Sequence, residues 1–446
     1  MKTIAHAAQA LATGQTTARD LVETSLARIA NPQGEGPLAF VTLYAEQARA
    51  QADAIDTLRR ANRAPSPLAG IPISAKDLFD IQGSPTPAGS KVLATAKPAE
   101  ANAPLIQRLL DAGLIIIGRT NMTEFAYSGL GINPHHGTPA SPWDRANRHI
   151  PGGSSSGAAV SVADGMVFAA LGTDTGGSCR IPAAMCGIVG YKPTARRVPI
   201  AGVLPLSTSL DSIGPLANSV ACAATIDAII AGQPTSTLAP APLAGLRLAV
   251  PQNYFLDDLD GPVSAAFDRA LRRLEKAGAI IIPTTFPEID DIAPANATGG
   301  FSAAEAFAWH RHLLAEKSAE YDPRVAIRIQ RGATMLAADL VDLLHTRAAI
   351  IARFNAATRD YDAILTPTCP LIPPRIADLA DDASYGRANI LQLRNPTVFN
   401  FLDRCSISIP CHAAGEPPVG LMLTGETMGD ARLFRIAAAA EQALAM

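Results

Sequence analysis

Charged and aromatic residues are scarce in this chain of 446 residues: 17% are Asp, Glu, Lys or Arg, and 5% are Phe, Trp or Tyr. The net charge is −3 and no block of like charges occurs, so the chain has no general attraction for nucleic acid. With few aromatic rings, the core must be built mainly from Ala, Leu, Ile and Val. This composition favours a large globular protein, and the length allows roughly two to three domains.

Long apolar runs and paired cysteines are missing as well. No run approaches the roughly 20 residues that cross a bilayer, and the first twenty residues, MKTIAHAAQALATGQTTARD, lack the apolar core of a signal peptide. The six cysteines form no CxxC pair, the usual spacing of a redox or zinc site. We therefore expect a reduced, cytoplasmic protein with no membrane partner.

Helix-like and strand-like segments alternate along the first part of the chain. Residues 68–77 predict a strand, in which Pro72 favours an edge or irregular position. A helix over 104–112, a buried strand over 114–117 and another helix over 120–127 follow. This rhythm is typical of a parallel sheet in an α/β protein.

The domain organisation follows from the absence of internal repeats. The sequence predicts one domain over residues 1–446, with an N-terminal helical part at about 1–65 and a less regular insertion at about 285–400. The best linker candidate is the Pro- and Ala-rich segment 231–243.

Two glycine–serine clusters mark the most unusual stretch, which runs from Pro151 to Lys192. The clusters are GGSSSG at 152–157 and TDTGGS at 173–178. The apolar segment between them, residues 158–171, is typical of a buried helix and a buried strand, so the clusters are not flexible linkers. Glycines at the ends of such elements let backbone N–H groups converge on a ligand. We interpret this stretch as a functional site.

Two familiar glycine motifs fit these clusters poorly. The run GSSSG places Ser155 at the centre of a G-x-S-x-G nucleophile elbow, but the residues before it make a poor strand. No lysine follows the glycines as in a phosphate-binding loop, and no GxGxxG begins a helix after a strand.

A metal site at His310 and His312 is also disfavoured. The two histidines are two positions apart and do not share a helix face. We expect no cofactor and no metal.

Ser178 fits a third interpretation of the site, in which the protein is a serine hydrolase that uses no histidine. The N–H groups of Thr175, Gly176, Gly177 and Ser178 could converge as an oxyanion hole. A serine hydroxyl needs a base, and Ser-Lys hydrolases use a neutral lysine. Lys76, at the end of an apolar strand, is the best-placed lysine, although a snorkelling surface lysine is the other interpretation. As a base it needs a pKa below the usual ~10.4.

The chain resembles the amidase signature family. The matching features are DTGGSCRIPAA at 174–184, the spacing of 24 residues between Ser154 and Ser178, ISAKD around Lys76, LTPT at 365–368 and PVGL at 418–421. The resemblance covers nearly the full length. It implies a large mixed, mostly parallel sheet covered by helices on both faces.

The resemblance also implies a role for each matched residue. Ser178 is the acyl-forming nucleophile, and Ser154, after a cis peptide bond with Gly153, is the bridging serine. Lys76 is the terminal base. A proton would pass from Ser178 through Ser154 to Lys76 and then to the leaving amine.

Further residues are assigned through the same resemblance. Thr173, Asp174 and Arg180 lie around the catalytic groups, and Arg180 is expected to brace the loop by pairing with Asp174. The substrate contacts implied for this family fall on Ala126, Tyr127 and Gly129.

The function expected from these residues is hydrolysis of C–N bonds in amides, with aryl esters and carbamates (urethanes) as further substrates. A catalytic subunit of a tRNA-dependent amidotransferase is the alternative, which the lack of a basic cluster weakly opposes. A non-catalytic binding protein is disfavoured because all three catalytic side chains are present. The expected partner is a small-molecule amide or carbamate, with no nucleic acid, bound to a monomer or homodimer.

Overall fold

The computed structural model describes residues 3–445, whose strands form one sheet of 11 strands. The strands are β1 (Phe40–Leu43), β2 (Pro72–Lys76), β3 (Ile115–Thr120), β4 (Ala169–Asp174), β5 (Val189–Lys192), β6 (Ser212–Ala217), β7 (Arg247–Pro251), β8 (Ile280–Thr284), β9 (Ala363–Pro367), β10 (Ser406–Pro410) and β11 (Gly420–Thr424). Their order across the sheet is β1-β3-β2-β4-β6-β5-β10-β11-β9-β7-β8.

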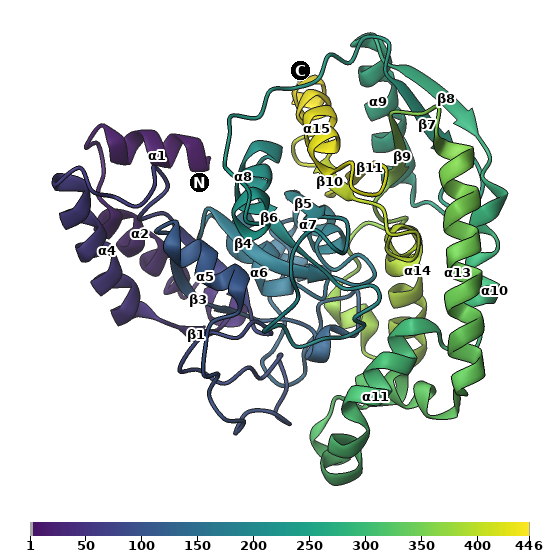
Figure 1. Ribbon diagram of the computed structural model, residues 1–446, viewed down its shortest axis with the longest axis horizontal. Helices are drawn as coiled ribbons and strands as arrows, with labels where there is room; N and C mark the ends of the chain where they lie inside the picture. The colour runs from purple at the N-terminus through teal and green to yellow at the C-terminus, as the bar shows by residue number, and fades with distance from the viewer. Residues whose placement is uncertain (1–2, 446) are drawn as a thin grey trace.

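Helices surround this sheet along its whole length (Figure 1). They are α1 (Ile4–Ala12), α2 (Ala18–Ile29), α3 (Gly36–Ala39), α4 (Ala45–Arg60), α5 (Pro104–Asp111), α6 (Ser156–Ala163), α7 (Arg180–Cys186), α8 (Val220–Ile230), α9 (Gly261–Lys276), α10 (Ile292–Ala295), α11 (Gly300–Lys317), α12 (Pro323–Gln330), α13 (Ala337–Thr358), α14 (Asp382–Phe401) and α15 (Asp430–Ala445). No helix among residues 3–445 is both long and apolar enough to cross a membrane.

The sheet is mixed, as expected for the α/β class. Parallel pairing is confined to the groups β3–β2–β4 and β9–β7–β8. The central strands β6, β5, β10 and β11 pair antiparallel with their neighbours, as does the edge strand β1. Antiparallel pairs therefore outnumber parallel ones, and the sheet is less parallel than the sequence suggested.

Separate apolar clusters on the two faces show that helices cover both sides of the sheet. Side chains of α2, α4, α6 and α7 pack in one cluster, while those of α1, α5, α8, α9 and α15 pack in another. A third cluster joins α13 and α14 to the strands β7, β9 and β11. These layers bury the apolar surface that drives folding, because burial contributes about 25 cal/mol per Å².

Two expectations about local structure are corrected. Pro72 does not mark an edge, because β2 lies between β3 and β4 and pairs with both. Pro72 is the first residue of its strand, a position that tolerates the missing N–H. The section 285–400 is largely helical, since α10 to α14 occupy most of it.

The expected N-terminal helical part corresponds to α1, α2 and α4, which lie together at one side of the molecule in Figure 1. Thr17 begins α2 with a capping box that includes Asp20, the arrangement that satisfies free N–H groups at a helix start. The segment 231–243 contains no helix or strand.

Candidate active site

Lys76 ends β2 in the interior of the protein, with no exposed surface. Its Nζ lies 2.7 Å from Ser154 Oγ and 2.8 Å from Thr173 Oγ1. Burial lowers the pKa of Lys76 to about 8. Nearby Cys179, Asp174 and Asp211 act in the opposite direction and raise this pKa, but burial has the larger effect. The structure thus excludes a snorkelling surface lysine and brings Lys76 to the first glycine–serine cluster.

Ser154 is fixed by a backbone of unusual geometry. The peptide bond between Gly153 and Ser154 is cis, as the family resemblance predicts. The Gly153 N–H donates to the Gly129 carbonyl at 2.7 Å, and the Thr123 N–H donates to the Ser154 carbonyl at 3.1 Å. The Ser154 hydroxyl is therefore held beside Lys76 by main-chain contacts on both sides.

Ser178 lies in the loop between β4 and α7 and lines a cavity of about 170 Å³. Its hydroxyl has no hydrogen-bond partner among residues 3–445. The residue as a whole is 4% exposed. A small molecule in this cavity would meet the Ser178 side chain.

The two clusters come close together at Gly172 of β4. A Cβ atom there would lie 2.7 Å from Ser155 Oγ and 3.0 Å from Cys179 Sγ, so these neighbouring side chains would have to shift. Ser155 is buried beneath the site, and its hydroxyl donates weakly to the Thr173 carbonyl at 3.5 Å. The nucleophile-elbow interpretation therefore loses its support, since no strand precedes Ser155 either.

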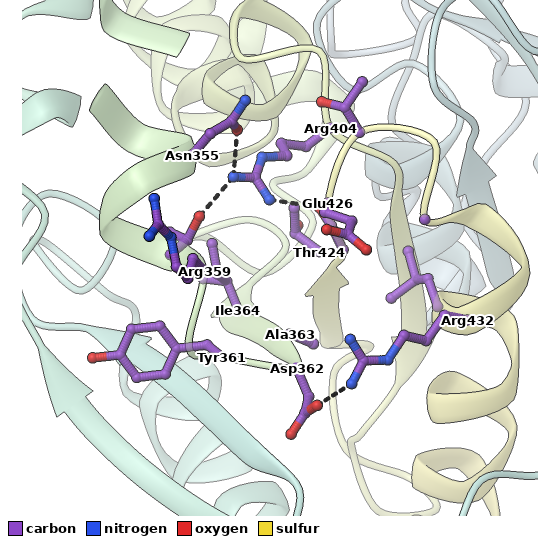
Figure 2. Close-up of a pocket in the computed structure, with 15 residues that line it drawn as sticks. Asn355, Arg359, Tyr361, Asp362, Ala363, Ile364, Arg404, Thr424, Glu426 and Arg432 are labelled. Atoms are coloured by element: carbon purple, nitrogen blue, oxygen red, sulfur yellow. Dashed lines mark hydrogen bonds and ion pairs between the residues drawn. The ribbon is translucent and has the colours of Figure 1, made fainter. Parts of the chain in front are cut away.

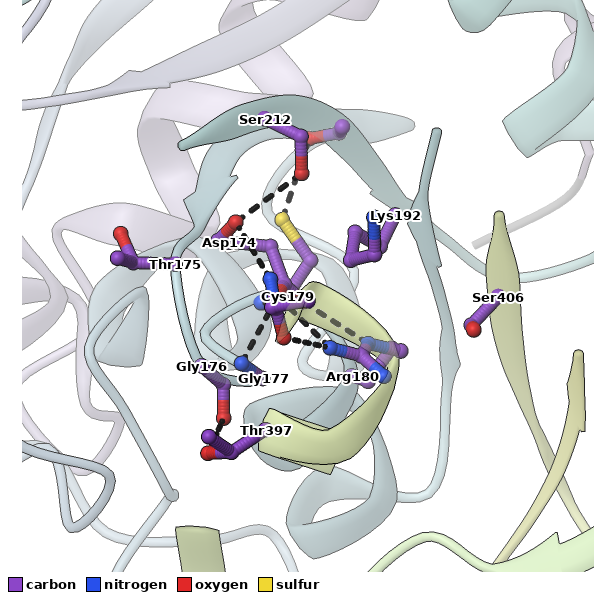
Figure 3. Close-up of polar contacts among 12 residues, drawn as sticks. Asp174, Thr175, Gly176, Gly177, Cys179, Arg180, Lys192, Ser212, Thr397 and Ser406 are labelled. Carbon is purple, nitrogen blue, oxygen red and sulfur yellow. Dashed lines mark hydrogen bonds and ion pairs between the residues drawn. The ribbon is translucent and has the colours of Figure 1, made fainter. Parts of the chain in front are cut away.

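Asp174 organises the loop that carries Ser178 (Figure 3). Its carboxylate accepts hydrogen bonds from the N–H groups of Gly177 at 2.8 Å and Cys179 at 3.1 Å. Arg180 donates to the same carboxylate at 2.9 and 3.1 Å, which is the expected pairing. Burial alone would raise the pKa of Asp174, but the Arg180 guanidinium holds it well below its usual range.

The expected oxyanion donors are not equivalent in the structure. Gly177 donates its N–H to Asp174, so it shapes the loop instead of facing the cavity as a free donor. The N–H groups of Thr175, Gly176 and Ser178 have no partner within the described part of the chain. These three remain the candidates for contact with a developing oxyanion.

Thr175 is held by a carboxylate that the sequence did not single out. Its hydroxyl donates to Asp211, whose other oxygen accepts the N–H groups of Leu206 and Ser207, both at 3.0 Å. Burial raises the pKa of Asp211 to about 6. Since Leu206 lines the cavity, Asp211 connects the candidate oxyanion loop to the cavity wall.

Two of the three expected substrate contacts line the cavity. These two are Ala126 and Tyr127. Ala126 ends a short 3-10 helix (Glu124–Ala126) and Tyr127 follows it, whereas we expected an α-helix in this segment. Phe125 and Ala126 have φ of 50° and 61°, a left-handed backbone that stops helix formation. Gly129 does not line the cavity; its N–H donates to Asn389 Oδ1 at 2.9 Å.

The sequence pointed to residues 285–400 as part of the pocket but did not single out the helix residues that line it. Arg328 of α12 lines the Ser178 cavity and is its one charged side chain, and it donates to the Tyr127 carbonyl at 2.9 Å. Asn389, Leu393 and Thr397 of α14 form another wall. Their spacing of four residues places them on one helix face, a signal visible only once α14 was known to cross the site.

Comparison with known proteins identifies the family. The model of the family described as Amidase matches residues 20–434. The chain belongs to the amidase family. Members of this family are enzymes that hydrolyse amides, and the mixed sheet with helices on both sides is the fold of its solved members.

Several relatives are similar over nearly their whole length. The 2-amino-5-chloromuconic acid deaminase of Comamonas testosteroni is 38% identical over 90% of this chain and 87% of its own. A glutamyl-tRNA(Gln) amidotransferase subunit of Chloroflexus aggregans is 37% identical, covering 97% of this chain and 94% of its own. A crystal structure of an amidase superposes with a TM-score of 0.89 at 32% identity, covering 99% of each chain.

Proposed function

We propose that this chain hydrolyses the C–N bond of small amides that carry a carboxylate, through an acyl-enzyme on Ser178. The observation that carries the proposal is the buried contact between Lys76 Nζ and Ser154 Oγ, the two residues that the family resemblance groups with Ser178, which lines a cavity. A lysine with a pKa of about 8 is roughly one-tenth neutral at pH 7, far more than an ordinary lysine, so it can accept a proton.

In this mechanism the first step is attack of Ser178 Oγ on the amide carbon. The Ser178 proton passes to Ser154 while the Ser154 proton passes to neutral Lys76, which keeps a hydrogen bond to Thr173. Collapse of the tetrahedral intermediate breaks the C–N bond, and the proton returns through Ser154 to the leaving nitrogen. Water then hydrolyses the ester, releases the acid and restores the Ser178 hydroxyl.

The charge that develops on the carbonyl oxygen needs donors that are already in position. The free N–H groups of Thr175, Gly176 and Ser178 can supply them, because Asp174 and Asp211 hold the loop from both sides. Loss of one such donor typically lowers the rate by about 10²–10³.

Arg328 supports a carboxylate as the recognised group of the substrate. It is the one charged side chain of the Ser178 cavity, and no carboxylate within the described chain pairs with it. A guanidinium matches a carboxylate in charge and geometry. The relative from Comamonas testosteroni acts on a substrate that is itself named as an acid, which agrees with this choice.

Two finer alternatives stay open to experiment. Carbamates (urethanes) and aryl esters pass through the same acyl-transfer chemistry and remain predicted further substrates. The 37% identity to an amidotransferase subunit supports a second role, as the catalytic subunit of a tRNA-dependent amidotransferase. Activity that appears only with a co-purifying partner would favour that role over a monomer or homodimer acting alone.

A substrate panel tests the proposal. Half-amides of small dicarboxylic acids should be hydrolysed with a higher kcat/KM than neutral amides of the same length, as measured by ammonia release. Arg328→Ala should remove most of that difference, while Arg328→Lys, which keeps the charge, should retain part of it. Equal rates for charged and neutral amides would contradict the substrate class, and no hydrolysis of any amide, carbamate or ester by the isolated chain would contradict the proposed function.

A further inference from the structure

A second cavity lies where α13, β9, β11 and α15 come together (Figure 2). Its volume is about 260 Å³. The lining shares none of its residues with the Ser178 cavity and contains no serine or lysine. Its charged members are Arg359, Asp362, Arg404, Glu426 and Arg432. The cavity is therefore built for ionic contacts.

Arg404 makes this cavity unusual. Three arginines in the described chain are buried, namely Arg119, Arg180 and Arg404, which are 1%, 0% and 4% exposed. Arg119 pairs with Asp77 at 2.7 Å and Arg180 with Asp174 at 2.9 Å. Arg404 has no carboxylate within ion-pair distance among residues 3–445.

The contacts of Arg404 are neutral and incomplete. Its Nη2 donates to Asn355 Oδ1 and Thr358 Oγ1, both at 2.6 Å, and its Nη1 reaches the Gly425 carbonyl only at 3.4 Å. Its Nε has no hydrogen-bond partner in the described structure. A buried charge normally requires a counterion, because its removal from water is strongly unfavourable. The protein holds this guanidinium in place, and Glu426 acts on its charge only from beyond ion-pair distance.

The other charges around the cavity define the kind of counterion that fits. Arg359 makes no ion pair with a described residue, whereas Arg432 pairs with Asp362. Three arginines and two carboxylates leave one net positive charge. A monoanion balances that charge, while a phosphate dianion would be repelled by Glu426 and Asp362. Ala363, Ile364 and Leu433 add apolar lining suited to a short carbon chain.

We propose that this cavity is a binding site for a small monocarboxylate, held by Arg404 and Arg359. The site is separate from the candidate active site but is connected to it through α14. Asn400, four residues before Arg404, accepts a hydrogen bond from Arg180 at 2.6 Å and donates to Asp174 Oδ1 at 2.9 Å. A carboxylate bound at Arg404 therefore sits next to the segment that braces the Ser178 loop.

The test is a binding titration of the full chain with sodium propionate at constant ionic strength, with sodium chloride and sodium phosphate as comparisons. Isothermal titration calorimetry and the thermal unfolding midpoint are measured in parallel. The titrations are made in the Arg328→Ala background, so that a carboxylate bound in the Ser178 cavity does not contribute. Propionate should bind saturably and raise the midpoint, whereas chloride and phosphate should not.

Variants on one helix and its following turn give a matched comparison. Arg359→Ala should weaken propionate binding at least tenfold, because it removes a cation that faces the cavity. Arg353→Ala, on α13 outside the cavity and paired with Asp291, should leave binding unchanged. Arg404→Gln should abolish propionate binding if this variant folds. If Arg404→Gln does not fold, the result for Arg359→Ala decides the test. Absence of saturable propionate binding, equal binding of phosphate, or equal affinities of the Arg359 and Arg353 variants would overturn the proposal.

Discussion

At the scale of single residues, the site depends on the protonation state of the Lys76 amine. Lys76 is enclosed, contacts two hydroxyls and has no carboxylate within ion-pair distance in the described chain. Burial without a counterion favours the neutral amine, which is the form that a base requires. Lys192 is also buried, with a pKa lowered to about 8 by burial, but its Nζ donates to the Pro193 carbonyl and makes no hydrogen bond to a serine among residues 3–445.

The first prediction concerns pH. Below a pKa of about 8 the Lys76 amine is protonated and cannot accept the Ser154 proton, whereas above it the amine is free. The rate of amide hydrolysis should therefore rise with pH, about tenfold per unit well below pH 8, and then level off. Intrinsic fluorescence over the same range would confirm that the protein stays folded. A rate that does not change between pH 6 and 8 would contradict a lysine base.

The second prediction compares the two buried lysines. Lys76→Met should lower kcat by about 10²–10⁴, the usual contribution of a positioned base. Lys192→Met changes a lysine of similar burial and pKa that lies outside the relay, so most of the activity should remain. Ser154→Ala combined with Lys76→Met should be no slower than the worse single variant, because the two groups act as one unit. Multiplicative losses would argue against a shared proton path.

The residues of the site were predictable where a motif names them. Lys76, Ser154 and Ser178 are marked by the family resemblance, and the structure brings Lys76 and Ser154 into contact. Arg328 and Asp211 were not predictable, because a single arginine or aspartate in a helix or loop looks like any exposed charged residue. Only the folded chain shows that one lines the cavity and the other holds Thr175.

At the scale of elements, α14 has a larger role than its sequence suggests. The helix runs past the Ser178 loop, lines the cavity with Asn389, Leu393 and Thr397, and braces Asp174 through Asn400. It contains Pro396 in its interior, a residue that normally discourages a helix prediction. The strand at Pro72 was misjudged for the same reason, since tertiary pairing outweighs a local preference.

The third prediction tests this bracing role. Asn400→Ala removes two hydrogen bonds to Asp174 and one from Arg180, which leaves buried polar groups without partners. The free energy of unfolding should fall by about 1–3 kcal/mol, and kcat should fall with it. Ile390→Ala, on an exposed position of the same helix, should change stability little. Both can be measured by denaturant unfolding, and equal effects of the two variants would contradict the bracing role.

At the scale of the whole molecule, one sheet connects the N-terminal helices to the C-terminal half. The α/β class was predictable from alternating apolar segments and the helices on both faces from the family resemblance, whereas the antiparallel centre of the sheet was not. Strand order depends on contacts between residues far apart in the chain, such as those of β5 with β10, which no local pattern encodes.

The fourth prediction concerns the single domain. Since all 11 strands form one continuous hydrogen-bonded sheet, we expect the chain to unfold in one cooperative transition. Differential scanning calorimetry, compared with far-ultraviolet circular dichroism, measures this. Two separate transitions, with β7, β8 and β9 lost first, would instead indicate two domains.

The most direct test of the central claim is covalent labelling with a fluorophosphonate, which reacts with an activated serine. After digestion, mass spectrometry should locate the label on Ser178, and labelling should be much slower in Lys76→Met than in Lys192→Met. A label on Ser155, or a labelling rate that Lys76→Met leaves unchanged, would contradict a Ser178 nucleophile activated by Lys76.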